Sequence, residues 1–284
     1  MVKIKDIFVK GRIFLEEKLQ GNLIIIGGAE DKKGEKNILK YLCNNLNKET
    51  DYLLIVTTAS KIPQELENEY KDVFRELGVK RIGALNINKR EDAFDDMNIK
   101  LLENADIVFF TGGDQLRLTS LLGGTKLYKK VIERFSEGCI FAGTSAGASV
   151  MSETMIISGE DDESPRKCTL KMAPGFGLIK GTIIDQHFAQ RGRVGRILVG
   201  IAENPQSLGI GIDEDTAIVV NKKGEISVIG SGAVYIFDGS GISYSNISEQ
   251  CPNEIFSIYD IKLHILINGD GFDMNSKTPI CRAH

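Results

Sequence analysis

Short runs of apolar residues alternate with longer helix-like stretches through the first two hundred residues of the chain. The apolar runs are continuous and rich in Ile and Val, and they cover 23–26, Tyr52–Val56, Arg81–Leu85, Ile107–Phe110 and 139–141. Such runs are typical of strands buried on both faces of a parallel sheet. Segments 64–77 and 127–136 are the clearest helix-like stretches between them. The pattern predicts βαβ units and an α/β fold with a mostly parallel sheet.

The pattern changes near residue 207. Closely spaced strand-like pieces follow, among them LGIGID, TAIVVNKKG, EISVIGSGAVYIFDG and YDIKLHILING, and the turn residues between them indicate hairpins. No internal repeat or low-complexity linker separates this region from the first. We therefore expect one domain over 1–284, with a parallel βα core at 1–206 and an antiparallel extension at 207–284.

Composition excludes several classes of partner. The 284 residues carry 35 Lys and Arg against 39 Asp and Glu, a net charge of −4 that favours neither nucleic acid nor an anionic membrane. The five cysteines are widely spaced and form no C-x-x-C pair, which indicates a reducing compartment. The first residues do not resemble a signal peptide, and no apolar run is long enough to span a membrane. We expect a cytoplasmic protein.

Several predicted strands end in Gly, Thr or Ser, as in GGAED, TTAS, TGGDQ and AGTSAG. Loops at the carboxyl ends of parallel strands hold the ligands of open α/β sheets, so these loops indicate a site on one edge. Simple strand termination is the alternative for each loop taken alone. The GGAED loop lacks both the full G-x-G-x-x-G spacing and a Walker lysine, which argues against a nucleotide site.

The segment Gly143-Thr144-Ser145-Ala146-Gly147 fits G-x-S-x-G, the nucleophile elbow. Small neighbours allow a turn tight enough to expose Ser145, and the N–H of Ala146 is then a candidate donor to an oxyanion. A small-residue packing turn between a strand and a helix is the alternative reading. The same reasoning makes the N–H of Gly113, in a glycine pair after a strand, a candidate second donor.

A serine nucleophile needs a base and a group that orients the base. Of the three histidines, His284 is the last residue and His264 lies in an alternating, strand-like piece. His187 ends an apolar run and is the candidate base. The orienting group is expected to be a carboxylate between these two residues or after them. The acidic segment SGEDDESPR offers four, and the sequence does not choose among Glu160, Asp161, Asp162 and Glu163.

These residues belong to a larger set of motifs that resembles the cyanophycinases, members of a serine peptidase group that includes the aspartyl dipeptidase called peptidase E. The matching pieces are IIIGGAEDK, FFTGGDQ, FAGTSAGASVMS, ESPR and IDQHFAQRGRVGR, in this order over residues 24–196. The last string is far more specific than G-x-S-x-G. The resemblance implies a mostly parallel sheet flanked by helices, similar to class I glutamine amidotransferases and flavodoxin, with antiparallel strands toward the C-terminus.

The resemblance also implies an activity. Cyanophycin is a poly-aspartate with arginine linked through its α-amino group to each β-carboxyl, and family members hydrolyse it to β-aspartyl-arginine dipeptides. By this resemblance Ser145 is the nucleophile, His187 the base and Glu163 the orienting acid, with Glu160 in reserve. No metal or cofactor is expected, because serine hydrolysis needs none. Family members are typically homodimers, so a homodimer is expected here.

Several polar residues near the base suit such a substrate. Arg191, Arg193 and Arg196 follow His187 closely, and guanidinium groups bind carboxylates bidentately. Asp185, Gln186 and Gln115 are candidates for reading its other polar groups. A solvated basic helix start is the alternative for the arginines, and a polar helix start is the alternative for Gln115.

Two other functions stay open at this point. An α-aspartyl dipeptidase of the peptidase E type would use the same serine chemistry, but it needs no run of carboxylate-binding arginines, so RGRVGR favours the polymer. A catalytically silent domain that binds a small ligand would need neither serine nor histidine, and a serine-directed fluorophosphonate would not label it.

Overall fold

A computed structural model describes residues 21–161 and 163–280. Within these residues the larger of two main sheets has nine strands, in the order β17–β16–β11–β10–β1–β5–β4–β2–β3. Its parallel part consists of β1 (Gly21–Ile26), β5 (Ile140–Thr144), β4 (Ile107–Phe110), β2 (Tyr52–Val56) and β3 (Arg81–Leu85). Antiparallel strands extend it beyond β1, namely β10 (Thr216–Asn221), β11 (Glu225–Gly230), β16 (Gly271–Asp273) and β17 (Thr278–Ile280).

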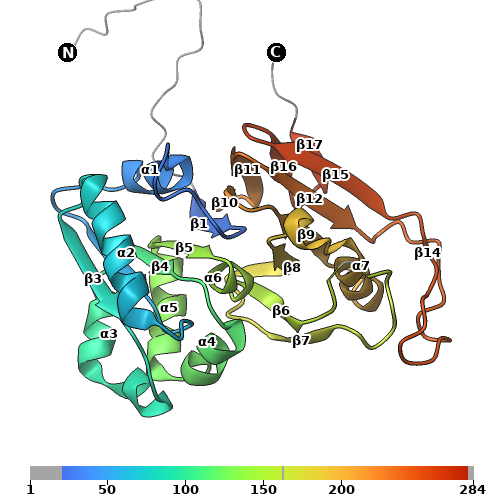
Figure 1. Ribbon diagram of the computed structural model, residues 1–284, viewed down its shortest axis with the longest axis horizontal. Helices are drawn as coiled ribbons and strands as arrows, with labels where there is room; N and C mark the ends of the chain where they lie inside the picture. The colour runs from blue at the N-terminus through green and yellow to red at the C-terminus, as the bar shows by residue number, and fades with distance from the viewer. Residues whose placement is uncertain (1–20, 162, 281–284) are drawn as a thin grey trace, which may run out of the picture.

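The smaller sheet lies beside the larger one (Figure 1) and, within the described residues, has six strands in the order β15–β12–β9–β8–β6–β7. These are β6 (Ser152–Ser158), β7 (Lys171–Pro174), β8 (Ile179–Gln186), β9 (Leu208–Ile212), β12 (Ala233–Asp238) and β15 (Lys262–Ile267). The short strands β13 (Tyr244–Ser245) and β14 (Ile258–Tyr259) pair with each other.

Helices cover both faces of the parallel part of the larger sheet (Figure 1). On one face pack α1 (Asn37–Asn44) and α2 (Pro63–Glu76), and on the other α3 (Asp96–Glu103), α4 (Gln115–Leu122) and α5 (Lys126–Glu137). The outer face of the smaller sheet is covered by α7 (Val194–Glu203). Shorter elements are α6 (Ala146–Ser149) and the 3₁₀ turns η1 (Arg90–Phe94) and η2 (Ala189–Arg191).

The predicted fold class is confirmed. The continuous apolar runs form the buried parallel strands, and the predicted strand at 139–141 becomes β5, which extends to the residue before Ser145. One detail differs, because β9 lies after residue 207 yet runs parallel to β8. The helix α7 connects these two strands, and a crossover of this kind returns the chain in the same direction. Among the described strands, every pairing made by β10 and the strands after it is antiparallel, and β7 pairs antiparallel with β6 earlier in the chain.

One hydrophobic cluster contains side chains of both main sheets, for example Phe110 of β4 with Met155 of β6 and Ile184 of β8. The single-domain organisation stays a prediction, and this shared core supports it. The strand β5 of the larger sheet and β8 of the smaller sheet both end at the same place. Ser145 follows the first strand and His187 the second.

Candidate active site

Ser145 lies in a tight turn between β5 and α6. Its backbone has φ 53° and ψ −110°, a conformation that costs energy for a residue with a side chain. The Ser145 N–H donates to the carbonyl oxygen of Ile26 at 3.1 Å, which ties the turn to β1. A Cβ on Gly147 would lie 2.3 Å from the carbonyl oxygen of Phe110. The small residues of this motif are therefore required by close backbone packing, and that packing holds the serine in its strained conformation.

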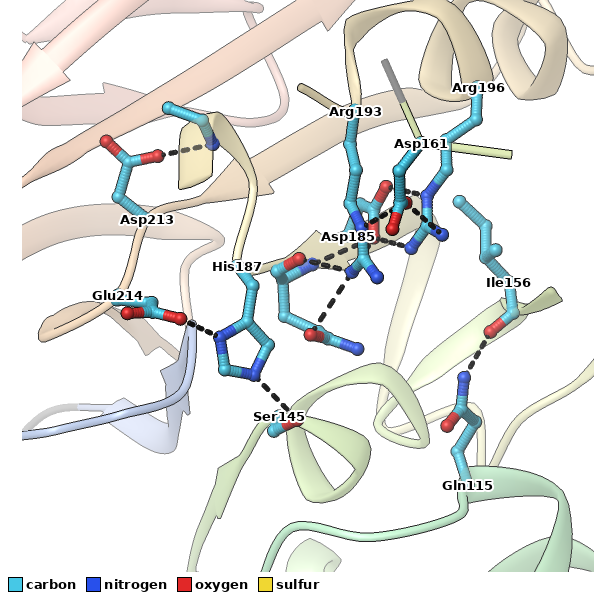
Figure 2. Close-up of polar contacts among 12 residues, drawn as sticks. Gln115, Ser145, Ile156, Asp161, Asp185, His187, Arg193, Arg196, Asp213 and Glu214 are labelled. Carbon is cyan, nitrogen blue, oxygen red and sulfur yellow. Dashed lines mark hydrogen bonds and ion pairs between the residues drawn. The ribbon is translucent and has the colours of Figure 1, made fainter. Parts of the chain in front are cut away.

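His187 follows β8 directly and faces the serine. Its Nε2 atom lies 3.1 Å from Oγ of Ser145 (Figure 2). Its backbone φ is 48°, and its N–H donates to the carbonyl oxygen of Gly27 at 2.8 Å. Gly28 packs against the imidazole, because a Cβ there would lie 2.4 Å from Cε1 of His187. The loop after β1 therefore seats the histidine ring.

Glu214 lies on the opposite side of the ring. Its Oε1 atom is 2.6 Å from Nδ1 of His187. Figure 2 shows the side chains of Glu214, His187 and Ser145 joined by two successive hydrogen bonds. Glu214 occupies the turn between β9 and β10, where its N–H donates to Oε1 of Gln190 at 3.1 Å. Asp213 accepts the N–H of Ala189 at 2.9 Å. When Nδ1 donates to the carboxylate, Nε2 is the unprotonated nitrogen that faces the serine hydroxyl.

The resemblance implies that Glu163 orients His187, but the structure does not place these two residues in contact. The carboxylate of Glu163 lies 3.4 Å from Nε of Arg166, and its side chain is half exposed. Glu160 is exposed in the same segment. The place beside Nδ1 belongs to Glu214, in the order serine, histidine, acid. The sequence signal for Glu214 is IDED at the end of a predicted strand, an acidic turn of the same kind as the segment SGEDDESPR.

Burial lowers the pKa of His187 below its usual value of 6.5. The hydrogen bond that His187 donates to Glu214 raises the pKa, and the positive charges of Arg191 and Arg193 lower it further. The net direction favours the neutral imidazole, the form that accepts a proton from a hydroxyl group.

Two candidate oxyanion donors lie at the serine turn. Gly112 abuts the serine, since a Cβ on it would be 3.4 Å from Cβ of Ser145. Within the described residues no protein acceptor contacts the N–H of the adjacent Gly113 or that of Ala146. The N–H of Ser145 itself is used by Ile26. Gly113 and Ala146 thus keep N–H groups that suit a developing negative charge.

Two of the three predicted arginines are buried. The side chains of Arg193 and Arg196 are 5% and 7% exposed, so the solvated-helix reading does not describe them. Asp185, 1% exposed, accepts from Nε of Arg196 at 2.6 Å and from Nη1 of Arg193 at 3.3 Å. Asp161 contacts both guanidinium groups from the other side (Figure 2). Arg191 is exposed.

The two glutamines already have protein partners. Oε1 of Gln186 accepts from Nη1 of Arg193 at 3.3 Å. Nε2 of Gln115 donates to the carbonyl oxygen of Ile156 at 2.6 Å and so joins α4 to β6 (Figure 2). Substrate contacts of these side chains stay predictions.

Glu30 is a site residue that sequence reasoning missed. Its side chain is buried, and it accepts from the hydroxyl of Thr144 at 2.5 Å and from the hydroxyl of Tyr70. Thr144 directly precedes Ser145, so Glu30 ties the loop after β1 to the serine turn. The signal was the acid in GGAED, which follows the first strand.

Other kinds of site have no support in the described ranges. No group of three or more His, Cys, Asp or Glu side chains there is placed to hold a metal ion. In the same ranges no helix is long and apolar enough to cross a membrane. A cavity of about 390 Å³ lies near the amino-terminal end of β1, away from the serine, between Leu23, Phe135 and Met274. None of the candidate site residues lines it.

Comparison with known proteins identifies the family of this site. The profile of peptidase family S51 matches residues 23–228, which include Ser145, His187 and Glu214. The chain belongs to peptidase family S51. This confirms the resemblance predicted from the sequence motifs and makes the chain a hydrolase of the peptidase class.

Curated S51 relatives extend the similarity over nearly the whole chain. A cyanophycinase of Geminocystis herdmanii is 37% identical over 267 residues, which cover 94% of this chain and 98% of the relative. A cyanophycinase of Trichormus variabilis is 37% identical over 263 residues, or 92% of this chain and 88% of the relative. Among solved structures, a peptidase from an acI-B1 actinobacterium shares the fold, with a TM-score of 0.64 and 24% identity over 90% of this chain and 98% of that one.

Proposed function

We propose that this S51 peptidase hydrolyses cyanophycin from a chain end and releases β-aspartyl-arginine through an acyl-enzyme. The hydrogen-bonded series Ser145, His187 and Glu214 carries the serine chemistry of the proposal. The substrate is proposed because the curated relatives that match over nearly the full chain are cyanophycinases.

The proposed reaction begins with proton transfer from Oγ of Ser145 to Nε2 of His187 as the oxygen attacks the α-carbonyl carbon of an aspartyl unit. Glu214 holds the ring in the productive tautomer and stabilises the imidazolium that forms. The carbonyl oxygen becomes negatively charged and receives hydrogen bonds from the N–H groups of Gly113 and Ala146.

Collapse of this intermediate breaks the peptide C–N bond. His187 gives its proton to the leaving amine, and Ser145 remains esterified to the acyl group. Water then loses a proton to His187 and attacks the ester, and the returning proton restores the serine hydroxyl. Each step uses the same nitrogen, which requires the imidazole to stay between serine and substrate.

Substrate binding is proposed for the polar residues around this centre. Exposed Arg191 suits a free carboxylate of the polymer, and the buried pair Arg193 and Arg196 lies near the base with its guanidinium groups paired to Asp161 and Asp185. Asp185 orients these two guanidinium groups from the buried side. Gln115 and Gln186 line the approach through their remaining amide atoms.

The test of the proposed function is incubation of the purified protein with insoluble cyanophycin, with soluble products identified by mass, beside the Ser145→Ala variant. Release of β-aspartyl-arginine by the wild type alone is the expected result. Cleavage of short α-aspartyl peptides in place of cyanophycin would transfer the proposal to the dipeptidase activity. Undiminished hydrolysis by Ser145→Ala would remove the serine mechanism.

A homodimer and a cytoplasmic location complete the proposal. The edge strand β15 supports the dimer, because Leu263, Ile265 and Ile267 on one face are 47%, 58% and 55% exposed. Their partners on β12, among them Tyr235 and Phe237, pack with Phe188 beneath α7. The apolar face of β15 lies beyond the part of the sheet that α7 covers. An exposed apolar edge strand invites pairing with another strand, and antiparallel pairing with β15 of a second copy would place the apolar side chains of the two copies side by side and remove part of their surface from water. Location in the cytoplasm stays a prediction.

A further inference from the structure

Two guanidinium groups beside the proposed base share one carboxylate oxygen. Oδ1 of Asp161 accepts from Nε of Arg193 at 2.9 Å and from Nη1 of Arg196 at 3.3 Å (Figure 2). Nη1 of Arg193 donates instead to the carbonyl oxygen of Gln186 at 2.5 Å. Gln186 directly precedes His187, so the arginine pair is attached to the chain segment that carries the base.

The two acids of this cluster differ in burial. Asp185 is 1% exposed and takes Arg196 through both of its oxygens, which fixes that pair. Asp161 is 41% exposed and approaches from the solvent side. Asp185 binds Arg196 bidentately and is held firmly, whereas Asp161 keeps one side in solvent, from which another carboxylate can reach the same buried guanidinium groups.

The charges of the cluster depend on Asp161. With it, two arginines face two carboxylates. Without it, two buried cations face Asp185 alone, and the N–H groups on Nε of Arg193 and Nη1 of Arg196 lose their acceptor. A site with one uncompensated positive charge and two donors that converge on a single place binds a carboxylate.

We propose that Asp161 is an internal competitor that occupies the carboxylate site of the arginine pair until a free carboxylate of the substrate displaces it. This inference rests on the proposed function, because it concerns the same substrate. Asp161 thereby sets the apparent affinity and the specificity of the site. A ligand without a carboxylate in this position gains no binding free energy at the arginines. A ligand with one replaces the carboxylate of Asp161 by its own.

The experiment measures binding without turnover. Tri-aspartate, which offers carboxylates and no guanidinium group, is titrated calorimetrically into Ser145→Ala and into Ser145→Ala/Asp161→Asn. Asparagine keeps the shape of the side chain and removes its charge. The expected result is that the double variant binds tri-aspartate about 3- to 10-fold more tightly, because the peptide no longer displaces an anion. The matched control is Ser145→Ala/Glu163→Gln, which removes the same charge two residues away, where Glu163 pairs with Arg166; its affinity stays that of Ser145→Ala.

Equal or weaker binding of tri-aspartate by the Asp161→Asn variant would overturn the proposal, and so would an equal gain in the control. Thermal unfolding of each variant identifies a loss of folding, and Asp161→Ala in the same background provides a second variant without the charge.

In the otherwise wild-type enzyme, Asp161→Asn is expected to lower KM for cyanophycin with little change in kcat. A rise in KM would instead assign Asp161 to the substrate's guanidinium groups. Failure of the proposed function is distinguishable, because tighter binding of tri-aspartate without any hydrolysis of cyanophycin would refute the activity alone.

Discussion

The Nδ1 atom of His187 lies 2.6 Å from a carboxylate oxygen of Glu214, a residue 27 positions further along the chain. The contact joins a residue after β8 to the turn between β9 and β10, and α7 lies between them in sequence. The geometry is that of a base oriented by an acid, with Ser145 on the other ring nitrogen.

Replacement of Glu214 by glutamine is expected to reduce kcat by roughly 10²- to 10⁴-fold, since the amide no longer selects the productive tautomer or stabilises the imidazolium. Glu163→Gln removes the same charge from a residue paired with Arg166 and should retain nearly full activity. Steady-state rates of product release on both variants test this. The reverse ranking would return the orienting role to Glu163.

The pH profile of kcat/KM follows the titration of His187. Burial lowers the pKa of His187, and the neutral form is active, so the acidic limb should have its midpoint below pH 6.5. The positive charge of Arg191 contributes to this lowering. Arg191→Gln should therefore raise the pKa and move the limb to higher pH. Lys222→Gln, at the opposite end of β10, removes one positive charge far from the ring and should leave the limb unchanged. A shift of equal size in both variants would argue against a local effect of Arg191.

Gly28→Ala tests the seat of the imidazole. The added Cβ would lie 2.4 Å from the His187 ring, so the ring must move, and a misplacement of about 1 Å costs roughly 100-fold in rate. Gly177→Ala is the control, because Gly177 also has positive φ but no atom lies within 4 Å of its added Cβ. Both variants pay the backbone strain of about 1–2 kcal/mol, which thermal unfolding measures. Only Gly28→Ala should lose turnover beyond its loss of stability.

Ile265→Lys tests the proposed dimer. A charge at the centre of the apolar face of β15 should dissociate the pair, because burying an unpaired ammonium group is unfavourable. Ile62→Lys changes a similarly exposed isoleucine at the start of α2 and should leave the assembly intact. Sedimentation velocity on the three proteins measures the result. A monomeric wild type would remove the dimer proposal, and a dimeric Ile265→Lys would place the interface elsewhere.

The parallel strands were predictable because each one reports its own burial. A strand covered on both faces needs apolar residues at every position, so β1, β2 and β4 appear in the sequence as continuous runs. The G-x-S-x-G turn was predictable for a similar reason. The close approach of α6 to β4 leaves no room for a side chain at position 147, so the sequence has glycine there.

The amino-acid sequence by itself determined the fold class, the serine turn and the histidine that faces it, since each depends on residues within one strand and the loop that follows. Only the tertiary structure decided which acid meets the histidine and which arginines are buried. Glu214 reaches His187 because the crossover through α7 places β9 beside β8, and Arg193 and Arg196 are charged residues that local patterning assigns to the surface. Their burial depends on Asp185 and Asp161, which approach from two different segments of the chain. Charge pairing of this kind leaves no local pattern in a sequence, because its partners are chosen by packing in space.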